Sequence, residues 1–305
     1  MKDELDLGAT TFLPAAPAGW FDYRYAILLD GNLALIRSDR DIHAEYADWW
    51  DRAQGGDLQA RQPNLRDARL RLSKFDGAVE TGAITVPAGH WPKVDCIADG
   101  RWLVVSIRAD PDESNARLFA VDGTPAGAFA IGDGVEHVRC APDGTIWVGY
   151  FDEGVFAGPD KNGGCPVSSS GVARFDSHGN LIWGFNGEQR ADLFIADCYS
   201  LALDGNTAWC CPYPYFPIVR IQDGVVDRWR SDIAGARAIA VAGDYVLLAG
   251  GYNGNFDRIA VLRLGGDRAQ QVGEARFDLQ ERTLRACCKD GEKLYTSPGR
   301  DAGRS

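Results

Sequence analysis

The sequence predicts an all-β chain, a six-bladed β-propeller built of four-stranded antiparallel blades, and three observations support this. A hairpin pattern of two apolar runs around an Asp-Gly type turn recurs six times along the 305 residues. A second, more amphipathic hairpin follows five of the six copies. Glycine is abundant, with 36 residues, which suits many tight turns between short strands better than long packed helices.

The two kinds of hairpin together define the repeating unit. Turns of the Asp-Gly and Asn-Gly kind between apolar runs are the strongest short-range signal for a β-hairpin. The six first hairpins span residues 25–36, 94–107, 138–150, 199–211, 239–249 and 285–296. The five second hairpins turn at Asp76-Gly77, Asp122-Gly123, residues 177–180, Asp223-Gly224 and residues 265–267. Two hairpins make one blade, with the more apolar pair innermost, and repetition around an axis makes a propeller.

Closure of the ring depends on the two ends of the chain. The last unit has no clear second hairpin, whereas residues 4–13 have the pattern of a spare outer strand. We therefore expect the N-terminal strand to complete the last blade, so that residues 1–305 form a single domain. Five or seven blades remain as alternatives, and either requires that one hairpin is misassigned.

The pattern resembles the broad group of six-bladed NHL-like and TolB-like propellers. The most typical outer hairpin runs from Arg174-Phe175-Asp176 to Trp183. The Gly-His and Trp-Asp signature of WD40 repeats does not recur at blade spacing. The resemblance covers most of the chain, and it implies a fold without implying an activity.

Charge and composition argue against some classes of binding partner and indicate a cellular location. The formal net charge is −11, and such an acidic surface repels phosphate backbones and anionic membranes. We expect no nucleic-acid partner and no membrane partner. The start of the chain lacks a signal pattern, and the eight cysteines lie mostly inside apolar runs. A cytoplasmic protein with reduced, buried thiols is therefore predicted.

Two long connections are expected on the same face of the propeller. The first, at about residues 38–56, predicts a helix that starts with a Ser-x-x-acid capping box at Ser38 and ends at Gly55-Gly56. Its Trp49 and Trp50 would either anchor a ligand or pack on neighbouring loops, and we favour packing. The second, at about residues 150–171, predicts a loop in which Asp152 and Glu153 adjoin aromatic residues. These two residues would either form a ligand-binding lip for a sugar or a cation or lie in a solvated loop.

A proline-rich segment, residues 212–217, is predicted as a rigid loop on that face. Its Tyr213 and Tyr215 would bind a sugar, a peptide or a protein, or would plug the channel.

Polar residues at the starts of the inner strands predict a pocket at the channel mouth. The candidate catalytic residues are Glu136, His137 and Asp95. The remaining candidate ligand-binding residues are His90, Trp91, Lys93, Asp197 and Arg237. Oxygen and imidazole groups from different blades suit a hard divalent cation, although no linear motif demonstrates one, so the cofactor stays open.

Two functions compete at this stage. The first is a recognition module that binds a protein or a small ligand at the loop-decorated channel face. The second is a metal-assisted hydrolase or lyase at the same channel mouth. We prefer recognition, because the sequence has no nucleophile elbow and no phosphate-binding motif.

Overall fold

The computed structural model describes residues 14–110, 113–159, 163–188 and 193–276, together with the backbone of residues 282–287 and 293–298. These residues divide into two compact units, an N-terminal unit of residues 14–130 and a C-terminal unit of residues 131–298. The expectation that residues 1–305 form one domain stays a prediction.

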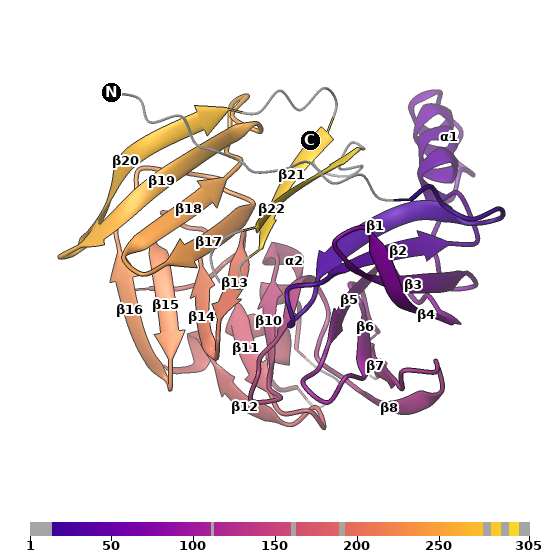
Figure 1. Ribbon diagram of the computed structural model, residues 1–305, viewed down its shortest axis with the longest axis horizontal. Coiled ribbons are helices and arrows are strands. Elements are labelled where there is room, and N and C mark those ends of the chain that lie inside the picture. Colours follow the sequence, from indigo (N-terminus) through magenta and orange to yellow (C-terminus); the bar gives the residue numbers. More distant parts are fainter. Residues whose placement is uncertain are drawn as a thin grey trace. The chain divides into compact units, whose positions relative to one another are not determined.

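The N-terminal unit contains two four-stranded antiparallel sheets with their strands in sequence order (Figure 1). The first consists of β1 (Phe21–Ile27), β2 (Leu33–Ser38), β3 (Arg69–Asp76) and β4 (Val79–Pro87). The second consists of β5 (Pro92–Cys96), β6 (Trp102–Ser106), β7 (Ala116–Phe119) and β8 (Pro125–Phe129).

The C-terminal unit contains three further sheets of the same kind and one hairpin. The third sheet consists of β9 (Val135–Cys140), β10 (Ile146–Tyr150), β11 (Val172–Phe175) and β12 (Leu181–Gly184). The fourth consists of β13 (Leu201–Asp204), β14 (Thr207–Cys210), β15 (Ile218–Gln222) and β16 (Val225–Trp229). The fifth consists of β17 (Ala238–Ala242), β18 (Tyr245–Ala249), β19 (Arg258–Gly265) and β20 (Arg268–Arg276). The hairpin is formed by β21 (Arg282–Cys287) and β22 (Lys293–Pro298).

The all-β fold and the blade unit are confirmed, but the expected number of blades is not. Within the described residues there are five four-stranded sheets and a sixth sheet of two strands, β21 and β22, instead of six complete blades. The proposed closing strand at residues 4–13 lies outside the described residues.

The turn chemistry located the hairpins correctly. The six first hairpins and five second hairpins that the turns predict are all present as antiparallel strand pairs. Burial follows the expected order in most sheets. Strands β2, β6 and β10 are buried along their whole length, whereas β8 and β12 have no buried residue.

The third and fourth sheets each contain a cross-strand pair of a tryptophan and an arginine. Trp147 on β10 pairs with Arg174 on β11, and the guanidinium lies 5.3 Å from the indole centre. Trp209 on β14 pairs in the same way with Arg220 on β15, at 5.7 Å. Each arginine covers one face of a large ring, and its charge is paired with a carboxylate, that of Asp143 for Arg174 and that of Asp227 for Arg220.

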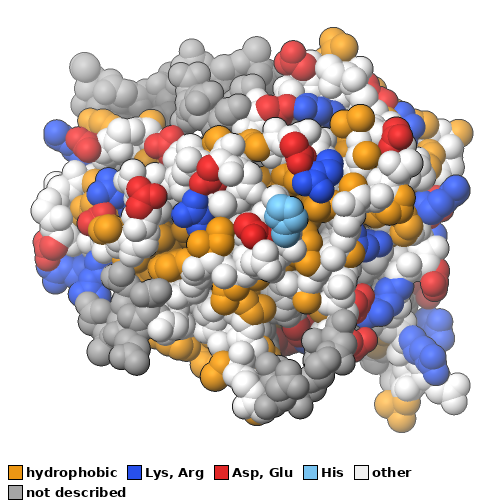
Figure 2. All heavy atoms as spheres, turned by 90° about the horizontal axis from the view of Figure 1, so that it is seen from below, with side chains coloured by type: hydrophobic (Ala, Val, Ile, Leu, Met, Phe, Trp, Pro, Cys, Tyr) orange, Lys and Arg blue, Asp and Glu red, His pale blue; other side chains and the backbone are white. Residues whose placement is uncertain are grey.

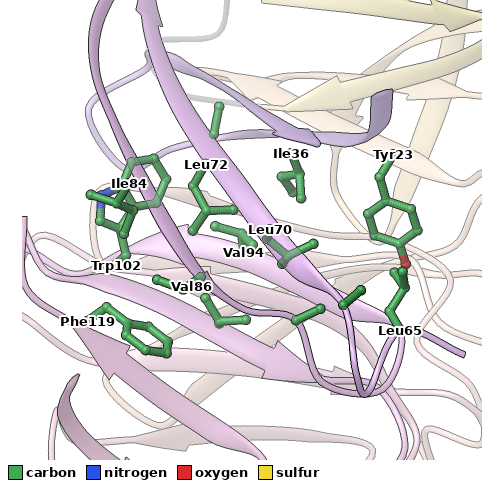
Figure 3. Close-up of a cluster of buried hydrophobic side chains, with 14 of the residues drawn as sticks. Tyr23, Ile36, Leu65, Leu70, Leu72, Ile84, Val86, Val94, Trp102 and Phe119 are labelled. Atoms are coloured by element: carbon green, nitrogen blue, oxygen red, sulfur yellow. The ribbon is translucent and has the colours of Figure 1, made fainter. Parts of the chain in front are cut away.

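The core of the N-terminal unit lies between its two sheets. Figure 3 shows Leu70 of β3 beside Val94 of β5, and Ile84 of β4 beside Trp102 of β6. Each such side chain is almost fully buried. Burial of one large apolar side chain stabilises a fold by roughly 1.5–3 kcal/mol, so this cluster holds the two sheets together.

The core of the C-terminal unit continues from sheet to sheet. Trp147 and Phe185 pack with Leu203 and Ile221 between the third and fourth sheets. A second cluster of the fourth and fifth sheets includes Trp209, Ile218, Ile239, Val246 and Leu248. As a result, the inner strands β9, β13 and β17 lie side by side in this order.

The predicted helix is present, but its start differs from the expectation. Helix α1 spans Ile42–Gln54, and its N-cap is Asp41, whose side chain accepts a hydrogen bond from the Ala44 backbone. Ser38 is not the cap, because it is the last residue of β2 and its Oγ accepts from the Arg40 backbone. Gly55 ends the helix as expected.

The second insertion is more structured than a loop. It contains helix α2 (Asp152–Val155) and a short 3-10 helix, η1 (Val167–Ser170). Ser168 joins them, since its buried Oγ donates a hydrogen bond of 2.7 Å to the Gly154 carbonyl.

The surface is mixed in character. On the face in Figure 2, acidic, basic and hydrophobic side chains are interspersed over the described residues. Among these residues, no helix is long and apolar enough to cross a membrane.

Candidate functional site

The connections of the C-terminal unit place an aromatic cluster at one end of its strands. Because each sheet is a meander, the segments that precede β13 and β17 emerge at the same end as the β14–β15 and β18–β19 connections. Tyr199 precedes β13, and residues 211–217 and 250–257 form the two connections. Loops on a rigid scaffold are the usual carriers of binding residues.

The proline-rich loop is fixed by backbone hydrogen bonds. The Tyr213 backbone donates to the Asp197 carbonyl at 2.8 Å, and the Ala196 backbone donates to the Tyr213 carbonyl at 2.9 Å. The Phe216 backbone donates to the Pro212 carbonyl at 3.1 Å. The segment is therefore a defined turn, as its prolines predict.

Two consecutive aromatic residues of this loop adopt a left-handed backbone. Tyr215 has a φ of 69° and Phe216 a φ of 50°. Such values are unfavourable for bulky residues and cost on the order of 1–3 kcal/mol each. The result is a separation of roles: Phe216 is only 6% exposed, whereas Tyr215 is 86% exposed.

Phe216 is the centre of the cluster. Its ring lies 5.1 Å from Tyr199, 5.6 Å from Tyr252 and 5.8 Å from Tyr213, measured between ring centres. The contacts with Tyr199 and Tyr252 are edge-to-face, the arrangement that aromatic pairs prefer. We call Tyr199, Tyr213, Tyr215, Phe216, Tyr252 and Arg237 the tyrosine surface.

A hydrogen bond between two hydroxyl groups orders the rings further. Tyr252 donates to the Tyr199 hydroxyl. Burial and the bond to Tyr199 both raise the pKa of Tyr252 well above its usual value. Tyr252 therefore stays protonated at neutral pH and is able to donate to a ligand or to Tyr199.

Arg237 adds a positive charge at the edge of this surface. It precedes β17, and its guanidinium lies 4.8 Å from the centre of the Tyr199 ring. The side chain is exposed and has no ion pair within the described residues. The contact with the Tyr199 ring holds the guanidinium in place, and its five N–H donors remain accessible to a ligand.

Several residues predicted from sequence lie beside this surface. Glu136 and His137 are on β9, half-buried, and Asp197 is a buried residue before β13. A Cβ added at Gly149 would lie 2.6 Å from the Cys198 Sγ and 3.5 Å from the His137 Cβ, so β9, β10 and the start of β13 meet here.

The electrostatics of Cys198 confirm how close these groups are and exclude a thiolate. A hydrogen bond with Cys210, burial, and the negative charges of Asp197 and Glu136 all raise the pKa of Cys198. The thiol stays protonated, and it is not an activated nucleophile.

Asp152 and Glu153 lie at the surface in the same unit. Both are exposed residues in the first turn of α2. The Glu153 backbone donates to the Asp152 carboxylate at 2.9 Å. This contact holds the helix start, and ligand binding by the two residues stays a prediction.

The remaining predicted residues belong to the N-terminal unit. Asp95 is 2% exposed on β5, and its carboxylate accepts from the Cys96 backbone at 2.7 Å. Lys93 is half-buried on the same strand. His90 and Trp91 precede β5, with 6.5 Å between ring centres, and Trp91 has a φ of 53°.

Helix α1 packs in part through its rings, and the choice between packing and ligand binding for its tryptophans stays a prediction. Ile42 is its only buried residue, and Trp50 is 47% exposed. The ring of Trp49 lies 5.9 Å from Trp50 and 5.0 Å from Tyr46. Trp49 is therefore half-buried within this row of rings, whereas Trp50 is exposed.

The metal site that the sequence left open draws its candidate residues from both units. In the part of the chain that the structure describes, no group of three His, Cys, Asp or Glu side chains lies close enough to hold a metal ion. The three candidate catalytic residues are divided between the units, with Asp95 in one and Glu136 and His137 in the other.

Three members of the tyrosine surface were not singled out from the sequence. Tyr199 and Phe216 lie in two connections of the fourth sheet, and Tyr252 of the fifth sheet packs against both. The one local signal is that Phe216 belongs to the proline-rich segment and Tyr252 to a glycine-rich loop.

Comparison with known proteins finds solved structures of low sequence identity to this chain. No protein-family model matches the chain, and no curated protein matches it. A functionally unknown protein from Desulfotomaculum acetoxidans has a TM-score of 0.49 and 11% identity, over 85% of this chain and 70% of that one. A putative 6-phosphogluconolactonase from Bacteroides uniformis has a TM-score of 0.47 and 16% identity, over 88% and 81%.

A third structure in this group is a named β-propeller. The Cps50 (Swd1) β-propeller domain from Myceliophteria thermophila has a TM-score of 0.46 and 9% identity, over 88% of this chain and 75% of that one. The repeated four-stranded meanders of the described residues are themselves the unit of the β-propeller architecture.

Proposed function

We propose that the C-terminal unit is a recognition module that binds a protein segment through the tyrosine surface. The observation that carries this proposal is the conformation of the proline-rich loop. Its left-handed backbone buries Phe216 as an anchor and keeps Tyr215 86% exposed. Strain of this kind persists where the surrounding structure imposes it, and it is common at binding sites.

The residue types of the surface favour a protein as the ligand. Tyr and Arg are enriched among the residues that dominate protein interfaces, because both offer large contact area together with hydrogen bonds. Tyr213 is 48% exposed and Tyr252 is 37% exposed, so both have ring area available for contact. Their positions are set by Phe216 beneath them, which lowers the entropy lost on binding.

The charges define what the bound segment should carry. Arg237 offers donors to a carboxylate or to backbone carbonyl groups, while Asp197 and Glu136 lie on the inner side of the same end of the unit. A segment with an apolar or aromatic side chain next to an acceptor group fits this arrangement.

The experiment is a selection of peptides from a displayed random library against the immobilised full-length protein. Bound peptides are then tested against Tyr213→Ala and against Tyr245→Ala. The control matches closely, since Tyr213 and Tyr245 are both 48% exposed tyrosines of the same unit, but Tyr245 begins β18 at the opposite end. We expect binding to be lost in the first variant and kept in the second.

Equal binding by both variants, or selection of no peptide at all, would remove the proposal. Glu136→Gln provides a second comparison. We expect it to retain peptide binding, because Glu136 is half-buried on β9 and outside the ring cluster. We do not propose the hydrolase or lyase, since no observation of the described residues favours it.

The expectations from the sequence about ring closure, cellular location and excluded partners stay proposals. We propose that residues 4–13 complete the β21–β22 hairpin as a sixth blade and close the ring. Deletion of residues 1–13 is expected to lower the melting temperature, and an unchanged temperature would contradict closure. The cytoplasmic location and the exclusion of nucleic acid and membrane likewise rest on composition and charge.

A further inference from the structure

A polar hollow lies on the N-terminal unit, whereas the tyrosine surface belongs to the C-terminal unit. Its volume is about 400 Å³, and it lies between helix α1 and residues 61–67. This volume falls within the ~300–1,000 Å³ that is typical of small-molecule sites. Trp49 contributes to its wall and is its one aromatic residue.

The charged groups around the hollow balance. Three arginines line it (Arg40, Arg52 and Arg61), and so do three carboxylates (Glu45, Asp48 and Asp67). A site for a phosphate or a nucleotide would carry an excess of positive charge, and a site for a cation an excess of negative charge. An equal mixture of planar donors and acceptors suits an uncharged ligand that both donates and accepts hydrogen bonds.

Trp49 is held in place by a row of rings that reaches the core. Its ring centre lies 5.0 Å from that of Tyr46, and Tyr46 lies 6.0 Å from Trp91 in an edge-to-face contact. Trp91 in turn packs against the buried cluster between the two sheets. A half-buried ring fixed in this way offers a preformed surface for stacking.

Ion pairs fix part of the polar wall. Arg40 forms a two-pronged ion pair with Glu45 through Nε and Nη2, and its remaining nitrogen, Nη1, donates to the Asn64 carbonyl at 3.0 Å. Arg52 pairs with Asp57 at 2.7 Å. These contacts tie residues 57–64 to the helix, so that the two sides of the hollow keep their separation.

Other polar groups of the wall remain available. Within the described residues, the side chains of Arg61 and Gln62 make no hydrogen bond and no ion pair, and both are exposed. Asp67 adds a carboxylate whose charge acts on Arg40. Donors and acceptors therefore surround a fixed indole ring.

We propose that this hollow binds a neutral, polyhydroxylated ligand, a short saccharide. The C–H face of a sugar ring stacks on Trp49, and its hydroxyl groups donate to Asp67 and accept from Arg61 and Gln62. The site does not depend on the tyrosine surface, because it uses residues of the other unit only.

The test is a binding titration of the full-length protein with three kinds of probe. The first is a panel of neutral trisaccharides (maltotriose, cellotriose, mannotriose and chitotriose), the second is trigalacturonate, and the third is choline. Binding is followed by calorimetry. We expect at least one neutral trisaccharide to saturate below about 10 mM, with trigalacturonate and choline binding more weakly.

Variants then assign that binding to the hollow. Trp49→Ala is expected to weaken binding of the same trisaccharide about tenfold, while Trp50→Ala changes it less than about twofold. Trp50 is the matched control, since it is the next residue of α1 and does not line the hollow. Gln62→Ala removes an exposed side chain with no contact to lose, and several-fold weakening is expected there too.

Several results would overturn the proposal. These are the absence of saturation by any neutral trisaccharide, preference for trigalacturonate or for choline, and equal effects of Trp49→Ala and Trp50→Ala. If Trp49→Ala fails to fold, Gln62→Ala decides, and unchanged affinity in that variant counts against the site.

Discussion

Gly235→Ala tests how the tyrosine surface is built. Gly235 lies in the β16–β17 connection with a φ of 74°, and Tyr252 lies directly over it. A Cβ at this position would be 2.8 Å from the Tyr252 Cγ and 2.9 Å from its Cδ1 and Cδ2. Real Cβ atoms do not approach a ring so closely, so the substitution must displace Tyr252 from its place beside Tyr199 and Phe216.

Gly235→Ala is expected to lower the free energy of unfolding in two ways, through backbone strain and through displaced packing, and Gly243→Ala measures the first of these alone. A left-handed backbone costs alanine roughly 1–2 kcal/mol, and displacement of a packed side chain typically costs a further 1–3 kcal/mol. Gly243 has a φ of 56° with nothing within 4 Å of its Cβ position, so Gly243→Ala incurs the backbone cost only. We expect Gly235→Ala to be the more destabilising by about 1–3 kcal/mol.

Urea denaturation of the two variants measures this difference in the free energy of unfolding. A companion readout is the pKa of Tyr252, followed by NMR of ring-labelled tyrosine. Burial and the Tyr199 hydroxyl raise this pKa in the native protein. Displacement of the Tyr252 ring in Gly235→Ala removes both its burial and its hydrogen bond to Tyr199, so the pKa of Tyr252 should fall toward the usual tyrosine value. Equal stabilities within ~0.5 kcal/mol and an unchanged titration would refute the packing described here.

Further predictions concern turns and thiols. Asp143 accepts hydrogen bonds from Thr145 and from Arg174, and these contacts lower its pKa against the opposing effect of burial. Because the pKa of Asp143 is lower in the folded than in the unfolded protein, its carboxylate stabilises the fold at pH values above the unfolded-state pKa. This stabilisation is lost as the pH falls through the folded-state pKa. Asp143→Asn should therefore cost about 1 kcal/mol at pH 7 and reduce the loss of stability below about pH 4, as followed by thermal melts; an unchanged acid profile would contradict this. In native protein, iodoacetamide should label the exposed Cys165 and spare Cys198 and Cys211, whose pKa values burial helps to raise, and peptide mapping that finds the latter two labelled would show otherwise.

The hairpins were predictable because their information is local. Turns such as Asp99-Gly100 and Asp143-Gly144 require a left-handed glycine, and Gly100 and Gly144 have φ values of 90° and 82°. Apolar runs on either side then specify paired strands. The sequence located the strand pairs of both units for this reason.

The start of α1 shows where local reasoning fails. Ser38 and Asp41 are both good capping residues, and the sequence alone favoured the first. Because Ser38 pairs with Leu70 on β3, Ser38 is the last residue of β2, and the helix begins only after Asp41. Tertiary pairing decided between two acceptable caps.

The candidate site was only partly predictable for a related reason. Tyr213, Tyr215 and Arg237 were identified, because prolines and charges at strand ends are visible in the sequence. Tyr252 was not, because its position depends on Gly235 beneath it and on Tyr199, which is 53 residues away. The number of complete blades depends on contacts of the chain ends, which no turn signal reports.

The most direct test of the recognition module is the affinity of one selected peptide for Tyr215→Ala and for Tyr245→Ala. Tyr215 is 86% exposed with its ring held out by the left-handed loop, so its removal should hardly change stability. A fluorescence anisotropy titration measures Kd for each full-length variant. We predict that Kd rises at least about tenfold for Tyr215→Ala, equivalent to roughly 1.4 kcal/mol, and stays within about twofold of wild type for Tyr245→Ala. Equal Kd values for wild type and Tyr215→Ala would contradict the proposal that this surface binds the ligand.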